Sequence, residues 1–411
     1  MQLSYNNKFK PQKNANQFFL KLKKSISTNS IILIILSIII ISLYILSIQF
    51  NWIKKFGWFG SHSNSNSIIP LHGYYKDDIL TKNTLIFPSI EHAPLLRELG
   101  IDGLFESIVD PQGLKHYKLT DSFDSEDSLL NNKLDDESTN QMLKIKNSFL
   151  NHGKLKFNGG NTPEIIIVTG VDFEKYELSH LTKIVQNRVN YAQRKNYGIY
   201  VRWLQEFIPL LENSQQSKEW CKIFLIRAAM YTFPNAKYFW YLDEDAIIMN
   251  YNIDLYKYLL HPKALEPIML KDQPIIPPNG VIHTFKNTKA ENVELILTQI
   301  GQDLNLNSFI IKNGFYSKSL LEFWSDKLFR NYHNFPGFAE SAITHILQWH
   351  PVYLARTALI PPRTIASLHS AIELKDDIHY NEGDFVASLR DCQSRKSCES
   401  EIDLYWSKTE N

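Results

Sequence analysis

The sequence predicts an α/β domain with a mainly parallel central sheet, behind a single apolar segment near the amino terminus. The domain is predicted by short β-branched or aromatic runs that alternate with segments of helical periodicity, because strand–helix–strand alternation is typical of parallel α/β folds. The apolar segment is Ile31–Phe50, which contains no charged residue.

The composition argues against several classes of protein. With 44% hydrophobic and 13% aromatic residues the chain is not globally disordered, and its 411 residues allow one large or two modest domains. Its 44 Lys and Arg residues balance 43 Asp and Glu residues, so we expect no nucleic-acid partner. Three cysteines are too few for a disulfide scaffold, and they do not form a structural zinc pattern.

Ile31–Phe50 predicts a transmembrane signal anchor. As a helix it spans about 30 Å, the thickness of a bilayer's hydrocarbon core. Six lysines and no acid precede it, which predicts a cytoplasmic tail over 1–30, the anchor over 31–50, and a type II topology with the rest of the chain lumenal. A cleaved signal peptide fits less well, because its apolar region is only about 7–15 residues long.

The lumenal part divides into two regions. Residues 51–160 contain a serine- and asparagine-rich stretch (SHSNSNS) and an acidic run that we interpret as a solvated loop, so they form a stem and an amino-terminal extension. Residues 161–411 contain the alternating pattern and form the predicted catalytic domain.

The elements of this domain begin with Glu164–Gly170 (EIIIVTG), a nearly continuous β-branched run typical of a strand buried on both faces. The elements expected after it are a helix over Leu178–Arg194, a strand over Gly198–Trp203, a helix over Glu219–Thr232 and a strand over Tyr238–Leu242.

The last of these strands runs directly into Asp243-Glu244-Asp245, and an apolar run follows at once. Carboxylates bounded by buried strand are costly to desolvate, so a positive group should lie against them. In open α/β sheets the carboxyl end of a strand is also where ligands bind. Asp243 and Asp245 could therefore share a divalent cation that bridges a diphosphate. The alternative is a turn in which both aspartates only cap backbone groups.

Six ordered blocks, covering roughly 160–395, carry a resemblance to a known family. The blocks are Asn187–Gly198, Trp220–Pro234, Lys237–Asn250, Leu304–Trp324, Glu340–Pro351 and Gly383–Cys392. They resemble the fungal α-1,6-mannosyltransferases of the mannan polymerase complexes, which belong to a galactosyl/mannosyltransferase family that also includes plant xyloglucan xylosyltransferases.

The resemblance implies a GT-A type glycosyltransferase fold, a nucleotide-sugar donor, Mn²⁺, and transfer with retention at the anomeric carbon. It implies that Asp243 and Asp245 bind the metal, with Asp243 also on the donor side. Further donor-binding candidates are Asn187, Arg188 and Arg227. A structural arginine is an equally good interpretation of Arg227.

The same resemblance implies three catalytic residues. Asn305 and Ser308 match an element near the donor sugar, although both could simply be turn residues before a strand over Phe309–Ile311. Glu340 matches an acidic position on the acceptor side, where it could orient the sugar or cap the helix that follows.

Several positions depart from the family pattern. Ser388 stands where the family has a histidine that supplies a third metal ligand, and His379 is a possible substitute. Ala366 replaces an Asn, and Asn307 replaces a Gly. These departures bear on metal affinity and turnover but leave both aspartates in place.

The cysteines allow one local pairing. Cys392 and Cys398 could close a short loop in an oxidising lumen, whereas Cys221 is expected to be a buried free thiol.

The function expected from the resemblance is a retaining, Mn²⁺-dependent α-1,6-mannosyltransferase. It would use GDP-mannose to extend cell-wall mannan or the outer chain of an N-glycan, in the early Golgi membrane and in a complex with other mannosyltransferase subunits. Three alternatives remain open: an α-galactosyltransferase that uses UDP-galactose, a weakly active or non-catalytic subunit of such a complex, and a membrane-tethered lectin.

Overall fold

The computed structural model describes residues 78–409, apart from residues 110, 112, 114, 120–140, 142–143, 146–147, 150–154, 212–216 and 373. These residues lie in one compact unit, Asn66–Asn411. No helix among them is both long enough and apolar enough to cross a bilayer. The anchor predicted at Ile31–Phe50 lies outside the described residues.

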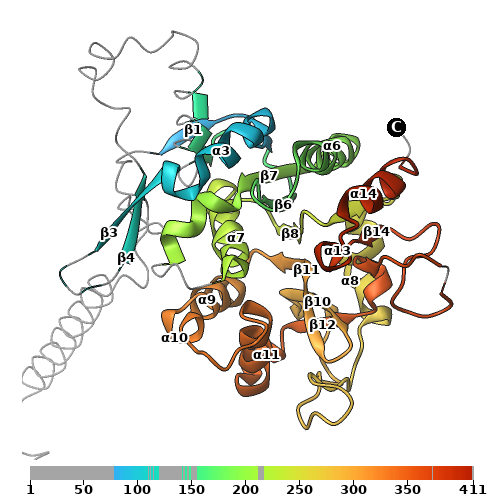
Figure 1. The fold of residues 1–411 in the computed structure, drawn as a ribbon. Helices are drawn as coiled ribbons and strands as arrows, with labels where there is room; N and C mark the ends of the chain where they lie inside the picture. Colours follow the sequence, from blue (N-terminus) through green and yellow to red (C-terminus); the bar gives the residue numbers. More distant parts are fainter. Residues whose placement is uncertain are drawn as a thin grey trace, which may run out of the picture. The chain divides into compact units, whose positions relative to one another are not determined.

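The central sheet has seven strands and is mainly parallel (Figure 1). Across the sheet they are β12 (Thr357–Ile360), β10 (Leu295–Ile300), β11 (Asp303–Lys312), β8 (Tyr238–Leu242), β6 (Ile165–Val171), β7 (Gly198–Trp203) and β2 (Leu85–Ile86). Only β11 runs against its neighbours, because it pairs antiparallel with both β8 and β10 while the other pairs are parallel. This confirms the predicted α/β class.

Three smaller sheets surround the central one. The first contains β13 (Ser367–Leu368), β14 (Val386–Ser388) and β9 (Ala246–Ile248); the others pair β1 (Ile79–Thr81) with β5 (Leu155–Phe157), and β3 (Phe105–Val109) with β4 (Lys115–Leu119). The α-helices are α3 (Ala93–Leu104), α6 (Leu178–Lys195), α7 (Cys221–Thr232), α8 (Pro262–Leu265), α9 (Phe315–Trp324), α10 (Lys327–Arg330), α11 (Ala339–Trp349), α12 (Pro351–Leu354), α13 (Cys392–Arg395) and α14 (Cys398–Trp406). The short helical segments are η1 (Ile90–His92), η2 (Leu204–Leu211), η3 (Lys218–Trp220), η4 (Tyr256–Leu260), η5 (Glu266–Ile268), η6 (Ala290–Asn292) and η7 (Pro362–Thr364).

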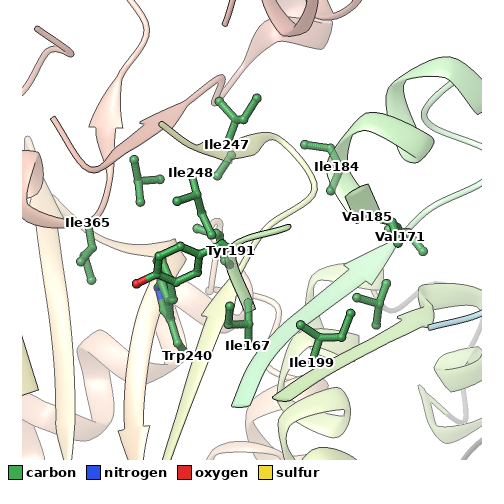
Figure 2. Packing of buried hydrophobic residues seen from close by; sticks show 14 of the residues in the cluster. Ile167, Val171, Ile184, Val185, Tyr191, Ile199, Trp240, Ile247, Ile248 and Ile365 are labelled. Carbon is green, nitrogen blue, oxygen red and sulfur yellow. The ribbon is translucent and has the colours of Figure 1, made fainter. Parts of the chain in front are cut away.

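The sheet is buried on both faces, as the β-branched run at β6 predicts. Ile165 and Ile167 pack into one apolar cluster, whereas Ile166 and Val168 pack into another, because successive side chains of a strand point to opposite faces. Helix α6 and strand β9 contribute to the first cluster (Figure 2), and α7, α9 and α11 contribute to the second. The five elements predicted between Glu164 and Leu242 are all present at nearly the predicted bounds.

This arrangement brings several strand ends together. Strands β7, β6 and β8 are parallel, so their carboxyl ends lie along one edge of the sheet. Strand β11 runs the other way, so its amino-terminal half begins at that same edge, where Ser308 pairs with Leu242. The residues that follow β8 therefore meet the amino-terminal half of β11, where the Asp243 amide donates to the Asn307 carbonyl.

Candidate active site

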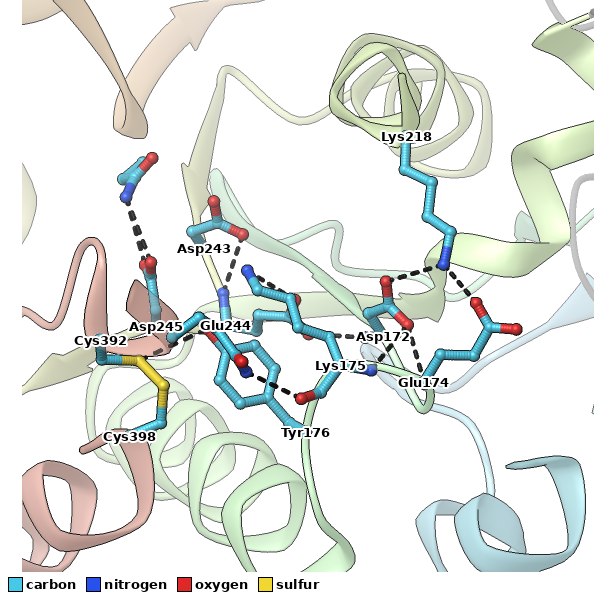
Figure 3. A network of polar contacts seen from close by, with 12 residues as sticks. Asp172, Glu174, Lys175, Tyr176, Lys218, Asp243, Glu244, Asp245, Cys392 and Cys398 are labelled. Carbon is cyan, nitrogen blue, oxygen red and sulfur yellow. Dashed lines mark hydrogen bonds and ion pairs between the residues drawn. A yellow bond between two sulfur atoms is a disulfide. The ribbon is translucent and has the colours of Figure 1, made fainter. Parts of the chain in front are cut away.

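Asp243, Glu244 and Asp245 form the three-residue connection between β8 and β9 (Figure 3). All three are buried, with exposed fractions of 5%, 1% and 6%. The backbone holds the connection as a tight turn, because the Ala246 amide donates to the Asp243 carbonyl over 3.2 Å and the Asp243 amide donates to the Asn307 carbonyl over 2.8 Å. The aspartates thus lie at the carboxyl end of a central strand, as predicted.

Asp243 is matched by a buried ammonium group. Lys222 of α7 lies with its Nζ 2.7 Å from Asp243 Oδ2 and 2.6 Å from Glu219 Oε2. Burial alone would raise the pKa of Asp243, but Lys222 and Lys175 outweigh that effect and lower it. Asp243 is therefore a carboxylate near neutral pH.

Asp245 is in a different electrostatic position. Burial, together with the nearby charge of Asp243, raises the pKa of Asp245 to about 6. Its carboxylate accepts hydrogen bonds of 3.3 and 3.4 Å from the side-chain Nδ2 of Asn307, a neutral group. Among the described residues no cationic side chain contacts Asp245, and two neighbouring carboxylates of which only one is matched by a cation suit a divalent metal.

Two aspartates alone do not make a complete metal site. Among the described residues, no three His, Cys, Asp or Glu side chains converge in a way that could hold a metal ion. The chemistry of the two aspartates nevertheless fits a hard divalent cation whose remaining positions are filled by substrate oxygens or water.

Glu244 faces a different partner from its two neighbours. Its Oε2 accepts a 2.6 Å hydrogen bond from the Asp172 amide, and its Oε1 lies 3.6 Å from Lys175 Nζ (Figure 3). Since Asp172 directly follows β6, Glu244 joins the ends of β6 and β8. We assign it a structural role.

Asn187 and Arg188 of α6 bind the backbone of the Asp243–Asp245 turn and of β9. Arg188 is fully buried, and its guanidinium donates to the carbonyls of Asp243 and Ala246 over 2.9 and 2.7 Å. Asn187 donates to the Ile248 carbonyl over 2.8 Å and accepts from its amide over 2.9 Å. Both side chains are buried and form hydrogen bonds with backbone atoms of the turn and of β9. This differs from the predicted contact with the nucleotide-sugar donor. The structure gives them a positioning role.

The third donor-binding candidate, Arg227, also lies away from the aspartates. Arg227 of α7 places its guanidinium 2.8 Å from both carboxylate oxygens of Glu322 on α9 and donates to Ser325. Lys222, five residues earlier on the same helix, is the residue that reaches Asp243. Sequence reasoning missed Lys222, although a lysine inside the apolar run WCKIFLIR is itself a signal of a buried partner.

The predicted catalytic residues on β11 lie in a bulge of that strand, which faces the two aspartates through Asn307. Between the pairs Thr298–Asn305 and Ile296–Ile310, four residues of β11 face one residue of β10, so β11 bulges where Asn307 and Ser308 stand. Both Asn305 and Ser308 are buried. The Asn305 side-chain amide donates to the Thr298 hydroxyl over 3.2 Å, and the Ser308 hydroxyl accepts from the Trp240 indole over 3.0 Å.

Glu340 retains access to solvent. It lies in the first turn of α11, accepts a 3.2 Å hydrogen bond from the Leu306 amide and lies 3.4 Å from Arg390, and its side chain is 20% exposed. Burial, partly offset by Arg390, raises its pKa. Of the three predicted catalytic residues, Glu340 is therefore the one with a side chain that a substrate could reach.

Ser388 lies beside the aspartates. In the pairing of β14 with β9 it stands opposite Ala246, and the next amide, of Leu389, donates to the Asp245 carbonyl over 2.6 Å. His379 cannot take its place. Its backbone pairs with Leu368 of β13, so β13 and β14 separate it from β9, and its ring is 2.7 Å from Asp376. Ala366 is fully buried before β13.

The cysteines are arranged as the sequence allowed. Cys392 and Cys398 form a disulfide that joins α13 and α14, and the hydroxyl of Tyr176 lies 3.9 Å from Cys392 Sγ (Figure 3). Cys221 is a buried free thiol. The disulfide therefore ties the segment that carries Ser388 and Arg390 to the carboxyl-terminal helix.

His180 makes the stability of this region depend on pH. Its Nε2 contacts the Glu244 carbonyl at 2.9 Å, so Nε2 is the protonated nitrogen, and its Nδ1 is buried with no hydrogen-bond partner among the described residues. Burial lowers the pKa of His180 to about 4, below its ordinary value of 6.5. The unfolded chain thus binds the proton first, and we expect about 3 kcal/mol of stability to be lost as the pH falls from 6.5 to 4.

This prediction is checked by urea unfolding of the purified protein at several pH values, with His180→Gln as the matched variant. Gln keeps a donor for the Glu244 carbonyl but does not titrate. The difference in unfolding free energy between the two proteins should shrink as the pH falls through this window. A constant difference would contradict the assignment of a neutral, buried His180.

Comparison with known proteins gives a consistent result over most of the chain. Residues 161–399 match the family model described as the galactosyl transferase GMA12/MNN10 family. The probable alpha-1,6-mannosyltransferase MNN11 of Saccharomyces cerevisiae is 39% identical over 365 residues, which cover 85% of each chain. An uncharacterized alpha-1,2-galactosyltransferase of Schizosaccharomyces pombe is 30% identical over 57% of this chain and 65% of its own. Among solved structures, a glycosyltransferase involved in glycosylation of the major capsid of PBCV-1 matches 59% of this chain with 14% identity and a TM-score of 0.42.

Proposed function

The chain belongs to the galactosyl transferase GMA12/MNN10 family and is a glycosyltransferase, and from this premise we propose that it is a retaining, metal-dependent α-1,6-mannosyltransferase that uses GDP-mannose. The observation that supports the chemistry is the buried pair Asp243 and Asp245 at the end of β8, where, within the described part of the chain, only Asp243 has a cationic partner in contact. The 39% identity to an alpha-1,6-mannosyltransferase supports the sugar and the linkage.

The proposal includes the setting of the enzyme. It assigns a GT-A type fold to residues 161–411, a single transmembrane helix to residues 31–50, a cytoplasmic tail to residues 1–30 and a stem to residues 51–160. The protein would then act in the early Golgi lumen on mannan or N-glycan acceptors, together with other mannosyltransferase subunits.

In this mechanism Asp243 and Asp245 would hold Mn²⁺, which supplies positive charge to offset the charge of the departing GDP. Arg188 and Asn187 fix the backbone that carries both carboxylates, so their spacing costs no reorganisation when the donor binds. Lys222 keeps Asp243 ionised.

The acceptor side is assigned to Glu340 with Arg390. Glu340 is the accessible acid next to the β11 bulge, and Arg390 keeps it oriented. In this position it would accept a hydrogen bond from an acceptor hydroxyl and steady positive charge on the sugar ring. Asn305 and Ser308 would act through the shape of the bulge that they help to build.

The proposal is tested by the product that the purified full chain makes from GDP-mannose and methyl α-mannoside. We expect an α-1,6-linked disaccharide, identified by NMR, and loss of the reaction in excess chelator with recovery on adding Mn²⁺. A β-linked product would contradict retention, and full activity in chelator would contradict the metal.

Replacing Lys222 by Met should make the stability of the protein depend on Mn²⁺. Without the ammonium, Asp243 is a buried carboxylate that has lost its closest partner, and we expect a loss of about 3–5 kcal/mol of unfolding free energy. A divalent cation bound by Asp243 and Asp245 would replace the lost charge, so Mn²⁺ should restore much of this loss. The measurement is chemical unfolding with and without Mn²⁺.

The matched control is Lys218→Met, because Lys218 lies one turn before Lys222 but pairs with Asp172, at 3.2 Å, and with Glu174. Mn²⁺ should change the stability of the Lys218→Met protein no more than it changes the stability of the unmodified protein. Equal responses of the two variants would mean that Asp243 does not bind the metal.

One specific observation favours a second candidate function. A relative that is 30% identical carries the name alpha-1,2-galactosyltransferase, so the same site could serve UDP-galactose. The two donors differ in both the base and the sugar, so direct comparison of transfer from GDP-mannose and from UDP-galactose decides between them.

A further inference from the structure

A cavity of about 720 Å³ lies away from the aspartates. Its walls come from the segment after β9, from residues 370–372 and 380–384 before β14, and from α14. Strands β9 and β14 run antiparallel, so Asp245 and Leu389 meet at one end of this pair, whereas Met249 and Phe385 meet at the other. The cavity begins at this second end with Met249, about 13 Å along the strand from Asp245.

Aromatic rings form a rigid part of the cavity wall. Tyr380 and Tyr405 pack edge to face with their ring centroids 5.2 Å apart, and the Tyr405 hydroxyl is 3.1 Å from His369 Nδ1. The Tyr251 hydroxyl accepts a 2.8 Å hydrogen bond from Asn187. Tyr251 and Tyr405 are 3% and 2% exposed and support the wall, so the partly exposed ring of Tyr380 is the aromatic surface that a ligand can contact with little loss of side-chain entropy.

Two polar side chains at the rim have no partner among the residues that the structure describes. Asn252 and Glu382 are exposed and line the cavity, and their side chains make no hydrogen bond or ion pair with any residue that the structure describes. Asp384 differs, because Arg363 holds both of its oxygens at 2.9 and 3.0 Å. The amide and the carboxylate thus offer donors and acceptors to a ligand.

The charges of the lining select against an anion. Glu382 and Asp384 are acidic, and the one basic residue among the lining side chains, Lys408, lies with its Nζ 5.8 Å from the centre of the Tyr405 ring. A diphosphate would meet carboxylates here without a cluster of cations. The ring of Tyr380, combined with the amide of Asn252 and the carboxyl group of Glu382, instead matches an uncharged polyol, which presents both C–H faces and hydroxyl groups.

We propose that this cavity is a second glycan-binding site, which holds sugar residues of the acceptor chain that are remote from the reacting end. The identity of the sugar as α-linked mannose rests on the proposed function. The cavity and the aspartates lie at the two ends of the β9–β14 pair, and an oligosaccharide that engages both, with its terminal sugar near Glu340, would have to span this distance of about 13 Å. Longer acceptors would then bind more tightly than a single mannoside.

The test is binding of α-1,6-mannotetraose and of methyl α-mannoside to the purified full chain, measured by calorimetry without any donor. The variant Asn252→Ala/Glu382→Ala should weaken binding of the tetraose by about tenfold, the loss expected for two hydrogen-bonding side chains. Binding of methyl α-mannoside should not change. The matched control, Glu291→Ala/Asn292→Ala, removes the same two groups at exposed positions outside this cavity.

Equal affinities of the cavity variant and the control variant for the tetraose would overturn the proposal. So would the same tenfold loss for methyl α-mannoside, because this result would place the two residues at the reacting end. The binding measurement needs no GDP-mannose, so it remains informative if mannosyl transfer is not observed. Conversely, transfer to methyl α-mannoside by the cavity variant tests the proposed function without the cavity.

Discussion

Replacing Asp243 by Asn is expected to lower the turnover of the purified protein by about 10²–10³-fold, the range seen when one preorganised electrostatic contact is removed. Asn has almost the same shape but no charge, so it would bind a metal only weakly and could not match Lys222. The fold should survive, because Lys222 keeps its ion pair with Glu219 at 2.6 Å. The measurement is kcat for sugar transfer, with circular dichroism to check the fold.

Glu244→Gln is the matched control for this variant. It removes one carboxylate from the same turn, but Glu244 contacts the Asp172 amide and Lys175 and has no proposed metal role. Turnover should stay within a few-fold of the unmodified protein. If both variants lose activity equally, the turn as a whole matters and the specific role of Asp243 is contradicted.

Replacing Arg188 by Met should lower the unfolding free energy by about 2–5 kcal/mol. The guanidinium donates to the Asp243 and Ala246 carbonyls and to the Thr169 hydroxyl, all in the interior. Removing it leaves buried acceptors with fewer donors. Transfer activity should fall as well, because the turn that spaces the two aspartates loses its support.

Two further variants separate this role from a general effect of charge. Arg188→Lys keeps the charge but cannot bridge two carbonyls, so it should also be destabilised. Arg194→Met, on the exposed face of the same helix, should change unfolding free energy by less than about 1 kcal/mol. An Arg188→Met protein as stable as the Arg194→Met protein would show that the contacts to the turn contribute nothing.

Local sequence pattern was sufficient for the elements that build the site. The β-branched run at Ile165–Val171 and the aromatic run at Tyr238–Leu242 predict strands because their side chains must be buried on both faces. The abrupt change from the second run to three carboxylates marks the strand end. These features depend only on neighbours in the chain.

The direction in which a side chain points within a buried helix could not be predicted. Both Lys222 and Arg227 lie on α7, and only the packing of that helix against the sheet and against α9 decides which one meets Asp243. Arg188 is similar: its sequence signal is equally consistent with a ligand contact or a structural one, and full burial decides for the latter.

Long-range pairing was also beyond the sequence pattern. The antiparallel course of β11 and its bulge depend on the pairing of β11 with β8 and β10, more than 50 residues apart in the case of β8. The position of Ser388 opposite Ala246 results from a pairing of β14 with β9 across about 140 residues. No periodicity within either strand specifies such a partner.

The central claim is mannosyl transfer from GDP-mannose, and the most direct test is a donor comparison. The purified full chain would be given GDP-mannose or UDP-galactose at equal concentration, with Mn²⁺ and an α-mannoside acceptor, and kcat/KM would be measured for each donor. We expect transfer from GDP-mannose to exceed transfer from UDP-galactose by at least about 10²-fold, since a site built for one donor leaves polar groups unpaired with the other. Preferred transfer of galactose, or no transfer from either donor, would contradict the account.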